Sequence, residues 1–203
     1  MATQSERNQA TRSALIGAGR ALFAERGYAE VSVTELAKRA GVTTGALYHQ
    51  FASKEGLFKA VYAELVQDVG AQVLKAQESA GEPTLLGDCE AYMAACADPA
   101  FNQITIDGPA VIGWDQILDE AQLMIEASLT AARDRGEITD VPIKSLARML
   151  AAALKEAAVM IATAEDATQA RAAANESARQ LITGLLTALP RGAAAVSSLR
   201  PKS

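Results

Sequence analysis

The sequence predicts a fold made entirely of α-helices, for three reasons. Half of the residues are hydrophobic (50%) but only 4% are aromatic, and alanine accounts for much of the apolar share. Alanine is the strongest helix former and is depleted in strands. Apolar residues also recur at spacings of three and four, and glycine and proline divide the chain into segments of helical length. With 203 residues, the chain can form one large domain or a small domain joined to a larger one.

The first segments predict helices with well-marked ends. Residues 8–26 have one apolar face, and the helix is expected to stop at Gly27. The sequence Ser32-Val33-Thr34-Glu35 then has the form of a capping box, in which the serine hydroxyl and the glutamate carboxylate each accept a backbone N–H. The short helix that it opens continues through Ala40, and Gly41 suits the left-handed position that closes a helix.

A third, very short helix is expected to begin at Thr43 or Thr44 and to end by Phe51. Ser53 then caps a fourth helix that extends to about Ser79. Two short helices around a glycine turn, with longer helices on either side, are typical of a helix-turn-helix unit.

The rest of the chain predicts further helices with proline and glycine between them. The expected helices cover residues 84–97, 99–106, 113–135, 142–164 and 168–189. The residues that separate them are Pro99, Gly108-Pro109 and Gly136. Pro142 has the early-helix position that proline favours, and Pro190 ends the last helix. Residues 191–203 are expected to form a flexible tail.

Charge is distributed unevenly along the chain. Residues 1–60 contain eight Lys and Arg against five Asp and Glu, a net charge of +3. Residues 61–203 contain eleven against nineteen, a net charge of −8, and the two values sum to the overall −5. A polyanion such as DNA is therefore expected to bind the N-terminal part.

Composition also disfavours several classes of protein. No stretch approaches the ~18 apolar residues of a membrane helix, and the N-terminus lacks a signal-peptide core, which predicts a soluble, cytoplasmic protein without a membrane partner. Cys89 and Cys96 are expected about 10 Å apart along a helix axis, too far for a disulfide, and to be small buried hydrophobes. Two cysteines and one histidine are too few for a structural zinc site. No metal or other cofactor is expected.

The sequence gives little support to an enzyme. Gly17-Ala18-Gly19 begins like a dinucleotide fingerprint, but Leu22 occupies the position of the third glycine and no strand precedes it. The G-x-S-x-G, phosphate-loop and H-E-x-x-H motifs are all absent. The one histidine, His49, lies in the predicted helix-turn-helix, which excludes a Ser-His-Asp triad. No catalytic residue is predicted.

A specific set of short motifs lies in residues 32–51, SVTELAKRAGVTTGALYHQF, and in the ASKEGLFKAV that follows. These motifs are Leu36-Ala37, Ala40-Gly41-Val42-Thr43, Leu47-Tyr48, Phe51 and Ser53-Lys54-Glu55-Gly56-Leu57. With them, residues 8–69 closely resemble the DNA-binding region of the tetracycline-repressor (TetR) family. The resemblance implies a helix-turn-helix DNA-binding domain over residues 8–69 and a helical ligand-binding and dimerisation domain over residues 70–190.

In a helix-turn-helix protein, the second helix of the motif enters the major groove with its N-terminus first. Small residues at that end, here Thr43, Thr44 and Gly45, can lie close to base edges, although either threonine can instead serve only as the helix cap. Tyr48, one turn later, can donate its hydroxyl to a phosphate. The resemblance makes Lys54 an anchor to the DNA backbone. The structural alternatives are helix packing for Tyr48 and a solvated charge for Lys54.

Two positions depart from the family pattern. Thr34 occupies a place where relatives often have a base-contacting arginine. His49-Gln50 replaces the usual Tyr/Trp-His pair. The resemblance would therefore pass the phosphate-binding role of the family's histidine to Gln50. His49 itself is either a DNA contact or an ordinary exposed histidine. The candidate DNA-binding residues are Thr34, Thr43, Thr44, Gly45, Tyr48, His49, Gln50 and Lys54. The residues assigned to the core of this domain are Leu36, Ala37, Val42, Leu47 and Phe51.

In the C-terminal part, residues 106–114 (IDGPAVIGW) resemble a short stretch of many TetR members. The resemblance implies an effector cavity in the helical domain, whose occupation is transmitted through the fourth helix and moves two DNA-reading heads apart. For each candidate pocket residue, plain core packing is the favoured alternative; the candidates are Met93, Phe101, Trp114, Met124, Met149 and Met160. The scarcity of charges around them indicates an apolar or aromatic effector.

The last two predicted helices carry apolar stripes, and the resemblance implies that they pair with their twins as a four-helix bundle in a homodimer. The candidate interface residues are Leu150, Leu154, Leu181, Leu185 and Leu189. The alternative is that both stripes are buried within one subunit. The predicted function is a ligand-responsive regulator, by family default a repressor, that a small molecule releases from a palindromic operator in double-stranded DNA. The alternative function is a helical small-molecule-binding or scaffold protein with little DNA affinity.

Overall fold

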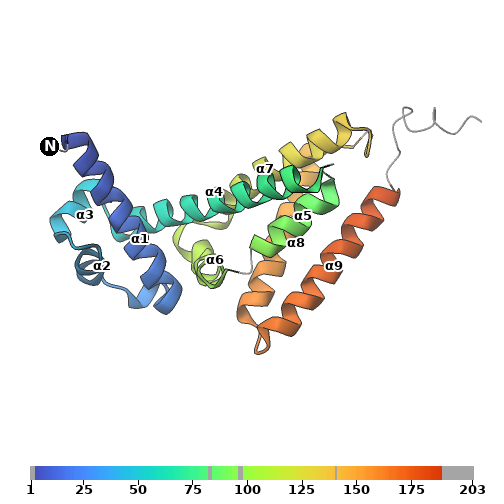
Figure 1. Cartoon of the computed structure of the whole chain (residues 1–203). Coiled ribbons are helices and arrows are strands. Elements are labelled where there is room, and N and C mark those ends of the chain that lie inside the picture. The colour runs from blue at the N-terminus through green and yellow to red at the C-terminus, as the bar shows by residue number, and fades with distance from the viewer. Residues whose placement is uncertain (1–2, 82–83, 96–97, 140, 189–203) are drawn as a thin grey trace, which may run out of the picture. The chain divides into compact units, whose positions relative to one another are not determined.

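The computed structural model describes residues 3–81, 84–95, 98–139 and 141–188, and within these ranges all regular secondary structure is helical (Figure 1). The all-α prediction is therefore confirmed. The helices are α1 (Gln4–Glu30), α2 (Val33–Ala40), α3 (Thr44–Phe51), α4 (Lys54–Ala80), α5 (Leu85–Ala95), α6 (Pro99–Val111), α7 (Trp114–Asp134), α8 (Ile143–Thr163) and α9 (Ala167–Ala188). Cys96, Leu189, Pro190 and the predicted tail 191–203 lie outside the described residues.

The chain forms two compact units. Of the described residues, the first unit contains 3–69 and 98–114, and the second contains 70–81, 84–95, 115–139 and 141–188. Helix α4 contributes residues to both units, whereas α1, α2, α3 and α6 belong to the first. No described helix is both long enough and apolar enough to span a membrane.

Helix α1 begins earlier and ends later than the sequence predicts. Thr3 and Glu6 form a second capping box, in which the Thr3 hydroxyl accepts from the Glu6 N–H at 3.2 Å. The expected stop at Gly27 is a break inside the helix, because Gly27 has φ 77° and ψ 166° and helical turns resume to Glu30. A left-handed φ of this kind is a conformation that glycine adopts without steric cost.

The caps of α2 and α4 form as predicted. The Ser32 hydroxyl accepts from the Glu35 N–H at 3.2 Å, and the Glu35 carboxylate accepts from the Ser32 N–H at 2.9 Å. Gly41 closes α2 with φ 68° and ψ 28°, the left-handed conformation. At the start of α4, the Ser53 hydroxyl accepts from the Gly56 N–H at 2.9 Å. These contacts fix both ends of α2 and the start of α4.

The core of the first unit is built around aromatic rings. Phe58 of α4 packs edge-on against Phe23 and Tyr28 of α1, with ring centroids 5.3 and 5.2 Å apart. Gly19 lets α1 and α4 approach closely, because a Cβ at this position would lie 2.9 Å from Cγ2 of Val61. The small domain therefore rests on α1 and the first half of α4.

Helix α6 extends further than the sequence predicts. The sequence predicts an end at residue 106, before Gly108-Pro109, but the helix continues to Val111. Proline removes one N–H from a helix; the next turn still closes here, because the Ile112 N–H donates to the Gly108 carbonyl at 2.7 Å. Contacts with α1 hold this end of α6: the Asp107 carboxylate accepts from the Tyr28 N–H at 2.7 Å, beside the break at Gly27.

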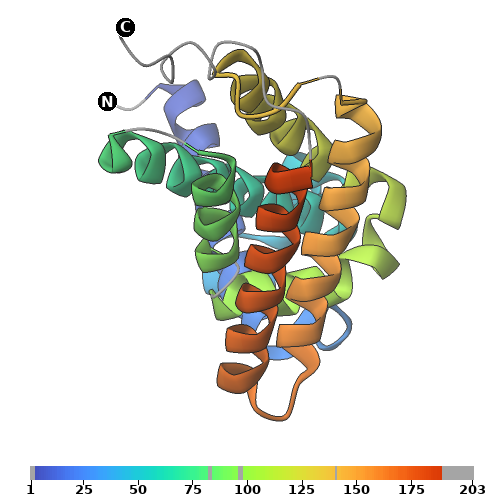
Figure 2. The same cartoon turned by 90° about the vertical axis from the view of Figure 1, so that its right-hand side faces the viewer.

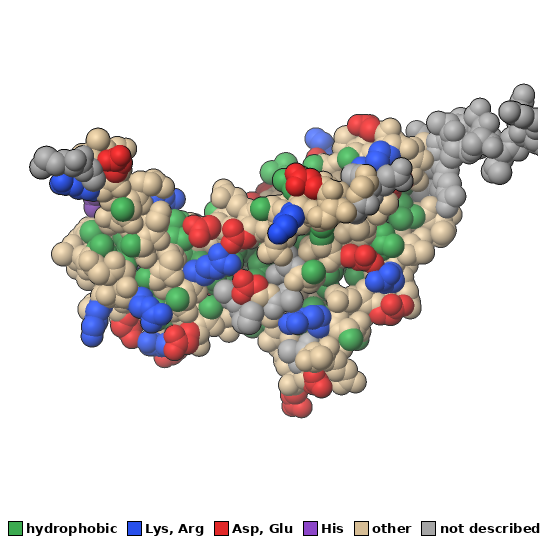
Figure 3. All heavy atoms as spheres, in the orientation of Figure 1, with side chains coloured by type: hydrophobic (Ala, Val, Ile, Leu, Met, Phe, Trp, Pro, Cys, Tyr) green, Lys and Arg blue, Asp and Glu red, His purple; other side chains and the backbone are tan. Residues whose placement is uncertain are grey.

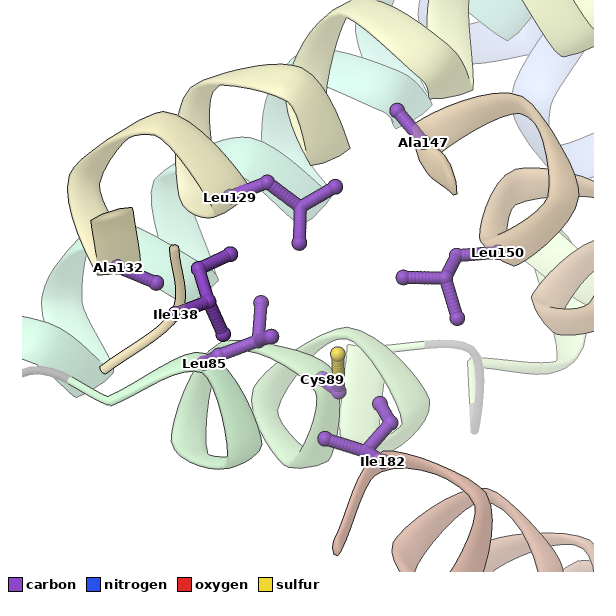
Figure 4. Packing of buried hydrophobic residues seen from close by; sticks show 8 residues of the cluster. All are labelled: Leu85, Cys89, Leu129, Ala132, Ile138, Ala147, Leu150 and Ile182. Atoms are coloured by element: carbon purple, nitrogen blue, oxygen red, sulfur yellow. The ribbon is translucent and has the colours of Figure 1, made fainter. Parts of the chain in front are cut away.

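The second unit has its own hydrophobic core (Figure 4). Its fully enclosed members include Leu85 of α5, Leu129 of α7 and Ile138 of the α7–α8 connection, and Leu150 of α8 and Ile182 of α9 complete the packing. Helices α8 and α9 lie side by side in this unit (Figure 2).

Candidate DNA-reading surface and ligand cavities

One face of α3 is exposed and the opposite face is buried. Leu47 and Phe51 point into the core of the first unit, with at most 8% of either side chain accessible. Thr44, Gly45 and Tyr48 lie on the exposed face, and 54% of Tyr48 is accessible. This division follows from the helical period, because residues three and four apart share a face.

The two threonines at the start of α3 have different environments. Thr43 is the N-cap, and its hydroxyl accepts from the Ala46 N–H at 3.2 Å. Thr44 is the first helical residue, and its side chain is exposed. A Cβ added at Gly45 would meet only the Thr43 hydroxyl, at 3.7 Å, so the helix presents a bare backbone beside Thr44. Close approach of another molecule to this end of α3 is therefore sterically open.

The remaining candidate DNA-binding residues of α2 and α3 differ in exposure. Thr34, in the first turn of α2, and His49 are exposed, and Gln50 is half-buried. Figure 3 shows the single histidine at the surface together with Lys and Arg side chains of the first unit.

Basic residues that the motif comparison does not single out also lie in the first unit. Lys38 and Arg39 are exposed in the last turn of α2. The Arg12 guanidinium of α1 lies 4.8 Å from the centre of the Phe51 ring at the end of α3. The net positive charge of residues 1–60 indicates that basic residues are in excess there, but it does not identify which of them are exposed near α3.

Lys54 makes intramolecular contacts that the sequence does not reveal. Its ammonium donates to the carbonyls of Tyr28 and Val31, at 2.7 and 2.8 Å, and lies 4.1 Å from the centre of the Tyr28 ring. These carbonyls belong to the C-terminal end of α1, which carries partial negative charge. Lys54 therefore fastens the start of α4 to the end of α1.

The six candidate pocket residues are distributed over both units. Phe101 and Trp114 belong to the first unit, where Phe101 is buried and 45% of Trp114 is accessible. Met93, Met124, Met149 and Met160 belong to the second unit. Met149 and Met160 are the most exposed of these, at 70% and 58%.

Two hollows of the second unit meet at α5. One of about 180 Å³ lies between α5 and α9, and its lining includes Met93 and Cys89. The other, of about 30 Å³, is lined mostly by apolar residues of α4, α5, α7 and α8, among them Met124 and Cys89. Burial is the main cause that raises the pKa of the Cys89 thiol to about 12, so the Cys89 side chain that lines both hollows is uncharged.

Asp88 is a polar residue in this apolar surrounding. Only 4% of the residue is accessible. Its Oδ1 accepts from the Gln77 side-chain amide at 2.7 Å, whereas its Oδ2 has no hydrogen-bond partner. Asp88 lines the smaller hollow, and sequence reasoning missed it because an acidic residue in a helix usually faces solvent.

A larger groove of about 600 Å³ runs between α8 and α9. Its lining includes Leu150, Leu154, Leu181 and Met160, together with many alanines. Leu150 and Leu154 are buried at 4% exposure, whereas 54% of Leu181 is accessible. Leu185 is half-buried beside the core of the second unit. The two helices thus place both buried and exposed apolar side chains along one groove.

Comparison with known proteins identifies the family. Residues 15–61 match the family described as "Bacterial regulatory proteins, tetR family", and residues 83–185 match the "Tetracyclin repressor-like, C-terminal domain". The chain is 33% identical over 116 residues to the transposon Tn10 TetC protein of Escherichia coli, covering 56% of this chain and 59% of that protein. It is 32% identical over 103 residues to the HTH-type transcriptional regulator BetI of Ectopseudomonas mendocina, covering 51% and 50%. The chain thus matches less than two thirds of either relative.

Solved structures show the same fold. A TetR-family transcriptional regulator from Pectobacterium atrosepticum is 28% identical with a TM-score of 0.77, over 93% of this chain and 100% of that one. RolR, solved in complex with its ligand resorcinol, is 21% identical with a TM-score of 0.66, over 98% of each chain. Both units of the chain, with the exposed α3 in the first, are covered by these matches. The chain therefore belongs to the TetR family, whose members are DNA-binding transcriptional regulators and not enzymes.

Proposed function

We propose that this chain is a ligand-responsive repressor that binds a palindromic operator as a two-fold symmetric homodimer and leaves it when a small molecule binds the second unit. In this proposal, residues 8–69 read the DNA, and residues 70–190 bind the ligand and form the dimer. The observation that carries it is the exposed N-terminal face of α3, with Thr44, Gly45 and Tyr48 on a small domain of net positive charge.

Direct reading of bases is assigned to the first turn of α3. Thr44 is exposed and free of the capping role that occupies Thr43, so its hydroxyl is available to a base edge. Gly45 lets the helix backbone approach the floor of the groove. Contacts to the DNA backbone are assigned to the residues that follow along α3, Tyr48, His49 and Gln50. Thr34 of α2 is assigned to the neighbouring edge of the groove.

Lys54 is assigned a positioning role in addition to any phosphate contact. An ammonium has three N–H donors, and the two carbonyls of α1 use two of them. The contacts hold the start of α4 against α1, and α1 supports α3 through Arg12 and Phe51. Lys54 therefore orients the reading helix even where the DNA does not touch it.

Dimerisation is assigned to the face of α8 and α9 around their groove. Met160 and Leu181, which line the groove, and Met149 of α8 are more than half exposed, although apolar side chains of this size normally avoid water. A second copy of the same two helices would cover them. Two reading heads about 34 to 36 Å apart would then meet half-sites one helical turn apart, which requires a palindromic operator.

The effector is assigned to the interior of the second unit. Of the two cavities that Cys89 lines, the smaller has a mostly apolar lining with a few polar groups, the usual composition of a small-molecule site, and the larger adds Glu90, Asn175 and Arg179. RolR, which shares the fold, was solved with resorcinol, a small aromatic molecule. The alternative function, a helical binding or scaffold protein with little DNA affinity, leaves the exposed face of α3 without a role.

The test is selection of bound sites from random DNA by the purified full chain, at a fixed salt concentration because the phosphate contribution depends on salt. The expected result is a palindrome with half-sites one helical turn apart. A matched pair of variants then locates the reader: Thr44→Ala should change the selected bases, whereas Thr168→Ala, at an exposed position of α9, should not. Recovery of no sequence motif would favour the scaffold alternative.

A further inference from the structure

Asp88 combines deep burial with an incomplete set of hydrogen bonds. Of its two carboxylate oxygens, Oδ1 accepts from Gln77 at 2.7 Å and Oδ2 has no partner, with 4% of the residue accessible. A buried polar atom without a partner loses its hydration and gains nothing in exchange. Such an atom is well suited to accept a hydrogen bond from a bound molecule, which would remove this cost.

The hollow beside Asp88 has the composition of a small-molecule site. Its lining is mostly apolar and comes from four helices: Val73 of α4, Leu85, Cys89 and Tyr92 of α5, Met124, Ile125 and Ser128 of α7, and Leu154 of α8. No Lys, Arg or His is found among the described residues that line it. An anion would therefore meet a carboxylate with no cation to balance it, whereas a hydrogen-bond donor would meet an open acceptor.

We propose that Asp88 is the polar anchor of the effector site and that the effector is a compact, mostly apolar molecule with one hydrogen-bond donor, an ammonium or a hydroxyl group, directed at Oδ2. The proposal rests on the proposed function in one respect, that the second unit binds an effector. It goes further by naming the chemistry of that effector and by excluding anions.

The site can widen to accept such a molecule. The hollow of about 30 Å³ holds only one or two waters, since a water needs roughly 10–15 Å³ measured this way. Met124 forms part of its wall, and methionine adapts its three rotatable bonds to fill or vacate space. Cys89 also lines the neighbouring cavity of about 180 Å³. Arg179, the one cation among the described residues that line that cavity, is paired with Glu90 at 2.8 Å, so a molecule that extends toward it meets no unbalanced positive charge.

The experiment compares four probes of similar size on the 203-residue chain: benzylamine, phenol, toluene and benzoate. Binding is measured by calorimetry and by the shift in melting temperature. Benzylamine, phenol or both should bind at least tenfold more tightly than toluene, and benzoate should not bind. A preference for one of the two donors distinguishes an ammonium from a hydroxyl effector. This comparison needs no variant, so it does not depend on how a substitution affects folding.

Asp88→Asn supplies the second arm. The asparagine keeps an oxygen for Gln77 and places an N–H donor where Oδ2 was, so the preferred donor probe should lose at least tenfold in affinity and benzoate should gain. The control is Glu126→Gln, which removes a carboxylate that also accepts from a glutamine side chain, Gln122 at 2.6 Å, but does not line the hollow. It should leave all four affinities unchanged.

Any of three outcomes would overturn the proposal and leave a hollow that holds only water. Toluene or benzoate binds the wild type as tightly as the donor probes, no probe binds the wild type, or Asp88→Asn keeps the preference of the wild type. Operator release is measured separately. A donor probe that binds through Asp88 but leaves operator affinity unchanged contradicts the release mechanism and not the site. A molecule that releases the operator equally from wild type and Asp88→Asn contradicts the site and not the release mechanism.

Discussion

At the scale of single residues, Lys54 and Tyr48 differ, although the sequence assigns both to the DNA backbone. Tyr48 is 54% exposed, whereas the Lys54 ammonium donates to two carbonyls of α1. The sequence predicts the position of both on the first unit, because the motif is local. It does not reveal the Lys54 contacts, because Tyr28 and Val31 lie more than twenty residues away.

We expect Tyr48→Ala and Lys54→Ala to weaken binding to all DNA sequences but to differ in stability. Lys54→Ala removes two charge-assisted hydrogen bonds that are partly buried and should lower the free energy of unfolding by about 1–2 kcal/mol. Tyr48→Ala removes an exposed ring and should leave it within about 0.5 kcal/mol of wild type. Urea denaturation and salt-dependent DNA binding measure the two effects. Equal stability of the two variants would contradict the positioning role of Lys54.

The two threonines of α3 make a second matched pair. Thr43→Ala removes the cap of α3 and should cost about 1 kcal/mol of stability, whereas Thr44→Ala should cost little. Thr44→Ala should instead relax the base preference at one operator position. Competition binding against single-base operator variants checks this. An unchanged preference profile would show that Thr44 does not read a base.

At the scale of helices, local signals were predictable and tertiary ones were not. Ser32, Gly41 and Ser53 mark helix ends through contacts within four residues, so the short sequence around each was enough to place them. The end of α6 was misplaced because Pro109 signals a stop, whereas the docking of Asp107 on Tyr28 supports a further turn. Asp88 was missed for a similar reason, since its burial depends on four packed helices.

The capping box of α2 gives a prediction about pH. The Arg26 guanidinium, followed by the Ser32 hydroxyl and N–H, lowers the pKa of Glu35 from 4.5 to about 2. A carboxylate whose pKa is lower in the folded state adds stability that is complete above the unfolded value and is lost as pH falls. The contribution of Glu35 should therefore be full above about pH 4.5 and disappear toward pH 2.

Titration of the Glu35 carboxyl by NMR checks this directly. The comparison is Ser32→Ala, which removes a hydroxyl that accepts from the Glu35 N–H and donates to the Glu35 carboxylate at 2.7 Å. It should destabilise α2 by about 0.5–2 kcal/mol and raise the pKa of Glu35 toward its ordinary value. A Glu35 pKa near 4.5 in the wild type would show that the ion pair with Arg26 does not form in solution.

At the scale of the whole molecule, effector binding and operator binding should each weaken the other, although the two sites are separate. We expect an effector to lower operator affinity by roughly 1 to 3 kcal/mol, the usual range of allosteric coupling. Operator DNA must then weaken effector binding by the same factor, because the coupling is reciprocal. Trp114 is the only tryptophan and is 45% exposed, so its fluorescence offers one reporter of either event. A bound ligand that leaves operator affinity unchanged would contradict the coupling.

The proposed dimer would set the strength of DNA binding, because linking two reading heads makes the second contact effectively intramolecular. Leu181 is the best position at which to test the dimer by mutation, because it lines the groove of α8 and α9 and is 54% exposed in one subunit. A charge there should be tolerated by the isolated subunit but would be buried and unpaired in a dimer, at a cost of several kcal/mol.

We therefore expect Leu181→Glu to give a monomer with normal helicity and little operator binding. Leu185→Glu should do the same but with some loss of stability, because Leu185 also packs against the core of the second unit. The control is Leu123→Glu, a leucine of α7 that is 68% exposed and does not line the groove. It should remain a dimer in analytical ultracentrifugation. Two results together would contradict the dimer: a wild-type protein that is monomeric at micromolar concentration, and footprinting that shows protection of a single half-site. A monomer on one half-site would bury no apolar face against a second copy and would require no symmetric operator.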